Sequence, residues 1–138
     1  VMDQFTVYIL AADEPFYEGP CESLSVPTIT GMYGVLAHHT NVIMAIVPGT
    51  LHYRCPGQEE QLAAVSAGLM KVENGEVLIL VDSAERPEEI DANRAKRAAD
   101  RAKEELLQKK SIQEYRMAQS NLARALSRLQ VKSSANKH

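Results

Sequence analysis

Glycine and proline occur only in the earlier part of this chain. All seven glycines lie at or before Gly75 and all six prolines lie at or before Pro87, so residues 88–138 contain neither. Both residue types form turns and interrupt helices. The sequence therefore predicts a turn-rich domain at residues 1–84 and a domain without helix breakers at residues 85–138.

The net charge changes sign near the same boundary. Residues 1–80 carry two basic and nine acidic side chains, a net −7, whereas residues 81–138 carry thirteen basic and nine acidic, a net +4, which together give −3. An overall charge of −3 is not typical of a general nucleic-acid-binding protein. No apolar run approaches the ~20 residues that span a bilayer, and residues 1–10 lack the basic start of a secretory signal. We expect neither nucleic-acid binding nor direct membrane insertion.

The sequence lacks the patterns of the common catalytic sites. It has no P-loop, no C-x-x-C or H-x-x-x-H spacing for a metal, and no G-x-S-x-G around a serine. His38 and His39 are adjacent, but no Cys, Asp or Glu follows within ten residues, so we expect surface or interface histidines. Cys21 and Cys55 are too few for a disulfide framework and are expected to be reduced. An enzyme acting alone is therefore not expected.

Short apolar runs separated by turn residues fill residues 1–84. Asn74-Gly75 supplies the pair of positive-φ residues of a two-residue hairpin turn. Short strands at this spacing predict a small antiparallel β-sandwich or barrel, and we exclude a parallel sheet because no helix-length segment separates the runs. The expected strands are Phe5–Leu10, Leu24–Val26, Val42–Val47, Leu51–Arg54, Leu62–Val65, Leu69–Val72 and Val77–Val81, with turns at 13–15 and 18–20 and a loop containing a brief strand at 31–36.

From Glu88 onward the apolar residues recur every three or four positions, which is the period of a helix. Asp91 is a candidate N-cap for a first helix, and Ser111–Glu114 matches the S-x-x-E capping box of a second helix. Two such helices predict an α-helical hairpin, which would be marginal alone and should dock on another surface. The polar tail at 132–138 is expected to fray. The two stripes are Ala92, Ala95, Ala99, Ala102 and Leu106, then Tyr115, Ala118, Leu122, Ala125 and Leu129.

Arginines recur on matching faces of both predicted helices. In an antiparallel hairpin they could converge on one polyanion, because guanidinium groups match phosphate oxygens bidentately. The alternative is a solvated face with ion pairs such as Arg101 with Glu105, and spacing alone favours it. The arginines on the first helix are Arg94 and Arg101, seven residues apart, with Arg97 close to their face; those on the second are Arg124 and Arg128, four apart.

Segments from the whole chain together resemble the epsilon subunit of bacterial F-type ATP synthase. They include Phe16-Tyr17-Glu18-Gly19, residues 66–72, residues 81–85 and the Ala/Arg-rich hairpin. The resemblance implies a non-catalytic rotor subunit of the central stalk, which couples proton or sodium flow to ATP synthesis. Its partners would be the gamma subunit, the c-ring and, with the hairpin extended, the alpha/beta catalytic head. It would be peripheral, on the cytoplasmic face of the bacterial membrane, and its mobile hairpin would inhibit ATP hydrolysis.

One further segment, residues 90–95, is similar to the I-D-x-x-R-A motif of epsilon subunits that bind ATP. The resemblance implies ATP as a regulatory ligand that favours the folded, non-inhibitory hairpin, and leaves Mg²⁺ open. Because helix spacing names the same arginines, we favour ATP binding over the solvated face. The alternative is a purely structural rotor subunit whose hairpin binds no nucleotide. The implied contacts are Glu85, Ile90, Asp91, Arg94, Ala95, Arg101, Arg124 and Arg128.

Two positions depart from the family pattern. Ala37-His38 replaces the usual Pro-Gly in the loop that lies near the rotor ring in the family, and Met32 occupies an often acidic position of the same loop. Ala67 replaces the first glycine of a Ser-Gly-Gly, which predicts a negative φ or mild strain there.

Overall fold

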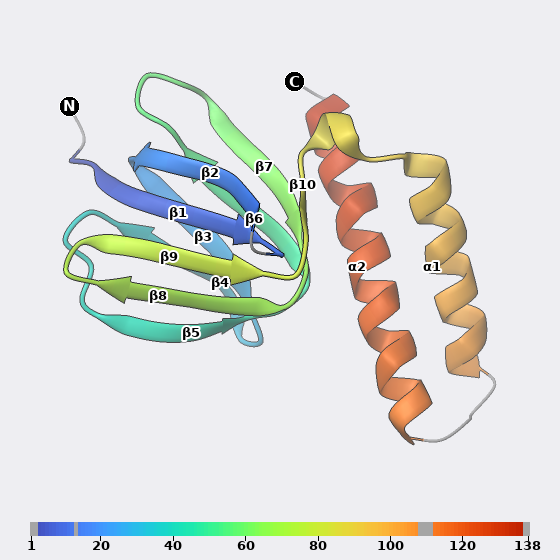
Figure 1. Ribbon diagram of the computed structural model, residues 1–138. Coiled ribbons are helices and arrows are strands. Elements are labelled where there is room, and N and C mark those ends of the chain that lie inside the picture. The colour runs from blue at the N-terminus through green and yellow to red at the C-terminus, as the bar shows by residue number, and fades with distance from the viewer. Residues whose placement is uncertain (1–2, 13, 108–111, 137–138) are drawn as a thin grey trace.

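The structure is a computed structural model that describes residues 3–12, 14–107 and 112–136. The N-terminal part forms a β-sandwich of two sheets, and two antiparallel helices stand beside one end of it (Figure 1). The helix nearer the sandwich is the second one, which packs on strands of one sheet, while the first helix packs on the second (Figure 1). The predicted fold class, a sandwich followed by a helical hairpin, is confirmed.

Each sheet contains five strands. The first sheet has the order β2-β1-β9-β8-β5, and the second has the order β10-β7-β6-β3-β4. The strands are β1 (Phe5–Ala11), β2 (Glu14–Cys21), β3 (Ser23–Thr28), β4 (Gly31–Leu36), β5 (Val42–Ile46), β6 (Gly49–Arg54), β7 (Glu60–Val65), β8 (Gly68–Glu73), β9 (Glu76–Val81) and β10 (Ala84–Glu85).

The exclusion of parallel pairing is wrong for one pair of strands. β1 and β9 run parallel, from Thr6 beside Glu76 to Ala11 beside Val81, while all other neighbours are antiparallel. A parallel pair needs a long connection, and a crossover helix is only its commonest form. Here the chain between the two strands builds the rest of the sandwich and so supplies that connection.

The predicted turn at 18–20, the part of the predicted turn at 13–15 that the structure describes, and one predicted loop also prove wrong, while Asp13 lies outside the described residues. Residues 14–21 form the continuous strand β2, although Pro15 and Pro20 lie within it. β2 is the edge of its sheet, where a residue without an N–H is tolerated. Residues 31–36 form the full edge strand β4 instead of a loop with a brief strand.

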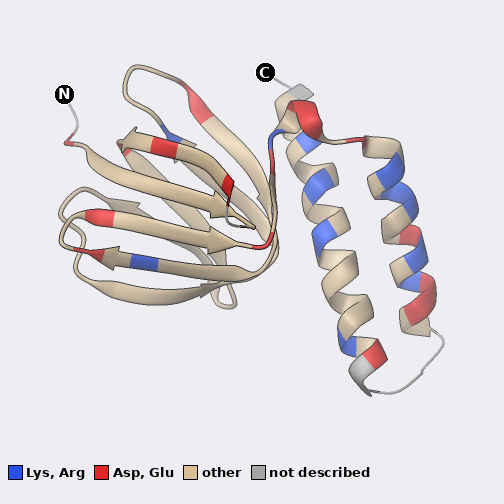
Figure 2. Cartoon of the chain, in the orientation of Figure 1, with Lys and Arg blue, Asp and Glu red and all other residues tan. Residues whose placement is uncertain are grey.

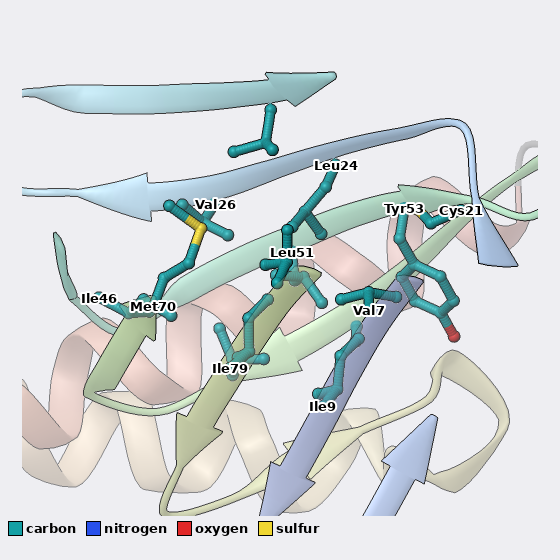
Figure 3. Close-up of a cluster of buried hydrophobic side chains, with 14 of the residues drawn as sticks. Val7, Ile9, Cys21, Leu24, Val26, Ile46, Leu51, Tyr53, Met70 and Ile79 are labelled. Carbon is teal, nitrogen blue, oxygen red and sulfur yellow. The ribbon is translucent and has the colours of Figure 1, made fainter. Parts of the chain in front are cut away.

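Aliphatic side chains from both sheets fill the space between them. Val7 and Ile9 of β1 meet Leu51 of β6, Met70 of β8 and Ile79 of β9, all fully buried (Figure 3). On β1, β8 and β9 these positions alternate with less buried ones, as expected for strands with one covered face. The same core contains both cysteines as buried free thiols.

Turn conformations agree with the residues found there. Asn74 and Gly75 have φ values of 51° and 80° between β8 and β9, so the predicted hairpin turn is confirmed. Ala67 has a negative φ, as predicted, whereas a Cβ added to the following Gly68 would lie 1.9 Å from the Leu80 carbonyl oxygen. His38 has a φ of 66°, so it adopts a left-handed conformation that glycine accommodates more readily.

The C-terminal part contains a short 3₁₀ helix η1 (Pro87–Glu89) and the helices α1 (Ala92–Leu107) and α2 (Ile112–Asn136). The predicted alanine stripes form the contact between the helices, since their central members are buried. The predicted capping serine, Ser111, lies outside the described residues. The expected fraying of the tail at 132–138 is wrong for residues 132–136, because α2 continues to Asn136, whereas residues 137 and 138 lie outside the described residues. The buried stripe residues are Ala95, Ala99, Ala102, Ala118 and Ala125.

Candidate functional site

A cavity of about 530 Å³ lies between β10, η1, α1 and α2. Its size falls within the range of small-molecule sites. Most lysines and arginines of the described chain lie on the two helices beside it, whereas the charged residues of the sandwich are mainly acidic (Figure 2). The cavity therefore combines a size suited to a small ligand with a basic surrounding surface.

Six of the eight predicted contacts line this cavity, and their role in nucleotide binding stays a prediction. Arg124 instead lines an adjoining hollow of about 220 Å³, which shares Arg101 and Arg128 with the main cavity. Ile90 does not line the cavity, because it is buried against Ala64 and Val131. The six are Glu85, Asp91, Arg94, Ala95, Arg101 and Arg128.

Three lining residues are absent from the predicted set: Glu89, Arg97 and Ala98. Arg97 and Ala98 lie three and four residues after Arg94 on α1, so helix periodicity alone places them on the same face. Glu89 belongs to the short helix η1, which the sequence pattern did not predict. Only the orientation of η1 against α1 brings its carboxylate to the cavity.

Asp91 sets the start of α1. Its Oδ1 accepts the N–H of Arg94 at 3.1 Å, and its carbonyl oxygen accepts the N–H of Ala95 at 3.0 Å. The predicted N-cap is therefore confirmed. The cap therefore fixes the start of α1, and its first turn, with Arg94 and Ala95, lines the cavity.

An ion pair joins the sandwich to α2 across the cavity. Nε of Arg128 donates to Oε1 of Glu85 at 2.6 Å, and the two side chains are 32% and 27% exposed. Glu85 belongs to β10 and is paired with Ala64 of β7. This contact links a residue held by the second sheet to a residue of the hairpin.

Arg86 ties the linker to the edge of the sandwich. Its guanidinium lies 4.0 Å from the centre of the Phe16 ring and donates to the Phe16 carbonyl oxygen. It also donates through Nη1 and its backbone N–H to Oε1 of Glu89, at 3.3 and 3.2 Å. Arg86 thus connects β2 to η1, and one carboxylate that faces the cavity is already paired.

The three acidic side chains that line the cavity all have partners. Glu85 pairs with Arg128, Glu89 with Arg86, and Asp91 caps α1. By contrast, no side-chain hydrogen bond or ion pair within the described residues involves Arg94, Arg97 or Arg101. Of the pairs expected for a solvated face, Arg101 with Glu105 is not among the described ion pairs.

α2 docks on the second sheet through a small apolar contact. Val131 packs with Ala64 of β7 and Ile90 of the linker, and Leu62 adjoins them. Nζ of Lys132 donates to the carbonyl oxygen of Pro87 at 3.4 Å. The predicted need of the hairpin for a docking surface is met by the sandwich itself.

This interface is imperfect in two places. The hydroxyl groups of Thr50 on β6 and Ser127 on α2 are buried and have no hydrogen-bond partner within the described structure. A buried hydroxyl without a partner costs free energy. The docked position of the hairpin is therefore less stable than a fully apolar contact of the same shape would make it.

A row of apolar side chains crosses the outer face of the first sheet. The register places Ala45, Leu69, Leu80 and Leu10 side by side across β5, β8, β9 and β1. Leu69 is 52% exposed and Leu80 is 43% exposed. Such a row of exposed leucines is typical of a protein–protein contact surface.

Further large apolar side chains are exposed near β4. Ile29 precedes this strand, and Met32 and Leu36 lie on it.

No described helix has the length and apolar character to cross a membrane. The described residues also contain no cluster of three or more His, Cys, Asp or Glu that could hold a metal ion.

Comparison with known proteins relates both parts of the chain to one family. Residues 4–87 match the beta-sandwich domain of the ATP synthase delta/epsilon chain, and residues 88–133 match its long alpha-helix domain. The ATP synthase epsilon chain of Caldanaerobacter subterraneus subsp. tengcongensis is 44% identical over 130 residues, 94% of each chain. That of Ruminiclostridium cellulolyticum is 40% identical over 128 residues, 93% of this chain and 95% of the relative.

Solved structures share the fold at lower sequence identity. A chain of the Euglena gracilis mitochondrial ATP synthase (OSCP/F1/c-ring) has a TM-score of 0.80 at 23% identity, over all of this chain and 84% of that one. A chain of the Tetrahymena thermophila mitochondrial ATP synthase central stalk/c-ring has a TM-score of 0.64 at 13% identity, over 97% of each. With both domains matched and relatives at 40–44% identity, this chain belongs to the ATP synthase epsilon chain family, a stalk subunit distinct from the catalytic one.

Proposed function

We propose that this chain is a rotor subunit in the central stalk of a bacterial F-type ATP synthase. It would couple proton or sodium flow to ATP synthesis by remaining attached to the rotor, while the beta subunits carry out the chemistry. It would be a peripheral protein on the cytoplasmic face of the cell membrane. Membership of the epsilon chain family supports this role.

The sandwich supplies surfaces that suit two fixed partners. The row of exposed leucines on the first sheet, which includes Leu69 and Leu80, suits a long-lived apolar contact with the gamma subunit. The exposed Ile29, Met32 and Leu36 near β4 suit the foot of the rotor on the c-ring. Both contacts would persist while the hairpin moves.

The hairpin is proposed to bind ATP as a regulatory ligand. The observation that carries this proposal is the cavity itself, where residues from β10 and both helices surround Arg94, Arg97 and Arg101, which form no ion pair among the described residues. Arg94 would bind phosphate, since its guanidinium has no partner among the described residues. Glu85 orients Arg128, at 2.6 Å, and would thereby shape one side of the site.

ATP binding would favour the docked hairpin. A ligand shifts an equilibrium between two states only by its difference in affinity for them. The cavity needs β10, α1 and α2 together, so it would exist only while the hairpin is folded against the sandwich. Extended into the catalytic head, the hairpin would block ATP hydrolysis. Its basic residues, Arg116, Arg124, Arg128 and Lys132, would then meet acidic residues of the beta subunit.

Isothermal titration of the full chain with ATP tests the ligand. Arg94→Ala should weaken binding at least tenfold, because a charge-assisted hydrogen bond is lost, while the thermal unfolding of the sandwich stays unchanged. Lys103→Ala removes the same charge from an exposed position of α1 outside the cavity and serves as the control. Equal affinities for the wild type and Arg94→Ala would refute the proposal that Arg94 binds phosphate.

Removal of residues 88–138 tests the inhibitory role. In a reconstituted complex containing the catalytic head, this deletion should raise ATP hydrolysis and leave ATP synthesis intact. Unchanged hydrolysis would count against the switch.

A purely structural hairpin remains the second candidate. It is favoured by the fact that Asp91 and Glu85, both motif residues, already have structural partners: Asp91 caps α1 and Glu85 pairs with Arg128. The same titration separates the two, since a structural hairpin would give no binding.

A further inference from the structure

Arg97 lines the cavity, although it lies outside the motif that points to nucleotide binding. It stands between Arg94 and Arg101 on α1, three residues from one and four from the other. Residues at these spacings are neighbours on a helix surface. The three arginines therefore form one continuous ridge along the side of α1 that faces the cavity.

This ridge is a row of like charges that form no ion pair among the described residues, although Asp100 lies three residues after Arg97 on the same helix. Glu85, Glu89 and Asp91 line the same cavity, but each is already bonded to another group. The three guanidinium groups have no side-chain partner among the described residues. Like charges at these helical spacings repel, so the arrangement is most stable when an anion lies against it.

The dimensions of the ridge favour an extended anion over a compact one. Seven residues separate its ends, which corresponds to about 10 Å along the helix axis. A single phosphate can contact only part of that length. An anion with several linked phosphate groups could contact all three guanidinium groups.

We propose that Arg97 is a third ligand-binding arginine of α1 and contacts the polyphosphate of the ligand together with Arg94 and Arg101. The proposal rests on the ATP site proposed above and adds to it a residue outside the motif. It also names the ligand chemistry that the ridge recognises, namely a chain of linked phosphates, whether carried by a nucleoside or free.

The neighbouring Lys96 provides a matched control. It carries the same charge, is exposed like Arg97, and does not line the cavity. Lys96→Ala and Arg97→Ala therefore change the net charge and the helix propensity of α1 almost equally. A difference between them reports on contact with the ligand, not on the general field of the helix.

The conservative variant Arg97→Lys tests the kind of contact. Lysine keeps the charge but lacks the planar fork that binds two phosphate oxygens at once. It should restore part of the affinity that alanine loses. Circular dichroism of each variant should match the wild type, because position 97 is exposed.

The experiment is calorimetric titration of the full chain and these variants with ATP and, separately, with inorganic tripolyphosphate. Arg97→Ala should bind both about tenfold more weakly than the wild type, Arg97→Lys should lie between them, and Lys96→Ala should change affinity less than about twofold. Equal affinities for Arg97→Ala and Lys96→Ala would overturn the proposal. If the wild type binds tripolyphosphate but does not bind ATP, the nucleotide site is refuted and the polyphosphate-binding ridge is supported. If it binds neither, both proposals are refuted.

Discussion

Replacing Val131 with alanine should loosen α2 from the sandwich without unfolding the helix. Val131 is fully buried against Ala64 and Ile90. The substitution removes two buried methyl groups, each worth about 0.8 kcal/mol, and leaves a small cavity, so about 2 kcal/mol is lost. That corresponds to roughly a 30-fold change in the docking equilibrium. Alanine is the better helix former by about 0.5 kcal/mol, so the helix itself is retained.

Hydrogen exchange measures this change directly. Amides in the C-terminal half of α2 should exchange roughly 30-fold faster in Val131→Ala, because the helix is only marginally stable once it leaves the sheet, and its hydrogen bonds then open far more often than in the docked state. Leu126→Ala is the control, because Leu126 lies on the same helix and is 45% exposed. Unchanged exchange in α2 would refute the reasoning. Faster exchange throughout β1 and β9 would also refute it, because the whole fold would then have been weakened.

The remaining predictions concern the sandwich and its interface with α2. Ser127→Ala should stabilise the docked hairpin by about 1 kcal/mol, since it removes a buried hydroxyl without a partner, and slower exchange in α2 would be the sign; faster exchange would contradict it. Gly68→Ala should cost about 3 kcal/mol in urea unfolding, because its Cβ would lie 1.9 Å from a backbone oxygen of β9, whereas Gly34→Ala, with open space around it, should cost far less. Burial raises the pKa of the Cys21 thiol and the Tyr53 phenol above their ordinary values of 9.0 and 10.0. The folded state therefore holds these protons more tightly than the unfolded chain, and stability should fall as the pH rises above about 9; a urea midpoint that stays constant there would disprove this.

Features that depend on neighbouring residues could be predicted from the sequence. Asn74-Gly75 forms its hairpin turn because the two residues tolerate positive φ. Asp91 caps α1 because its carboxylate can reach the first turn of the helix that follows. The alanine stripes are buried because their spacing places them on one side of each helix. Each of these outcomes is decided within a few residues of the chain.

Features that depend on distant partners were missed. The parallel pairing of β1 with β9 joins two segments that are adjacent in the sheet but about 70 residues apart in the sequence, and no local pattern encodes it. β2 contains residues that normally form turns, and only its position at a sheet edge makes it a strand. The polar sequence at the end of α2 predicted a frayed tail. In the structure the helix extends to Asn136, and Val131 contacts the sandwich while Lys132 bonds to the linker.

The candidate site shows the same division. The seven-residue spacing of Arg94 and Arg101 predicted that they share one face of α1, and in the structure both line the cavity. The motif also named Ile90, whose side chain does not line the cavity but packs against Ala64 of β7 and Val131 of α2. Glu89 reaches the cavity only through the turn of η1 and its bond to Arg86.

The central claim is that the ligand stabilises the docked hairpin, and one distance measurement tests it most directly. Spin labels at the exposed positions Glu76 on the sandwich and Gln119 on α2 would report the separation of the two parts in the Val131→Ala chain. We expect two populations without ligand and a single docked population with saturating ATP. A distance distribution that ATP leaves unchanged would contradict the claim.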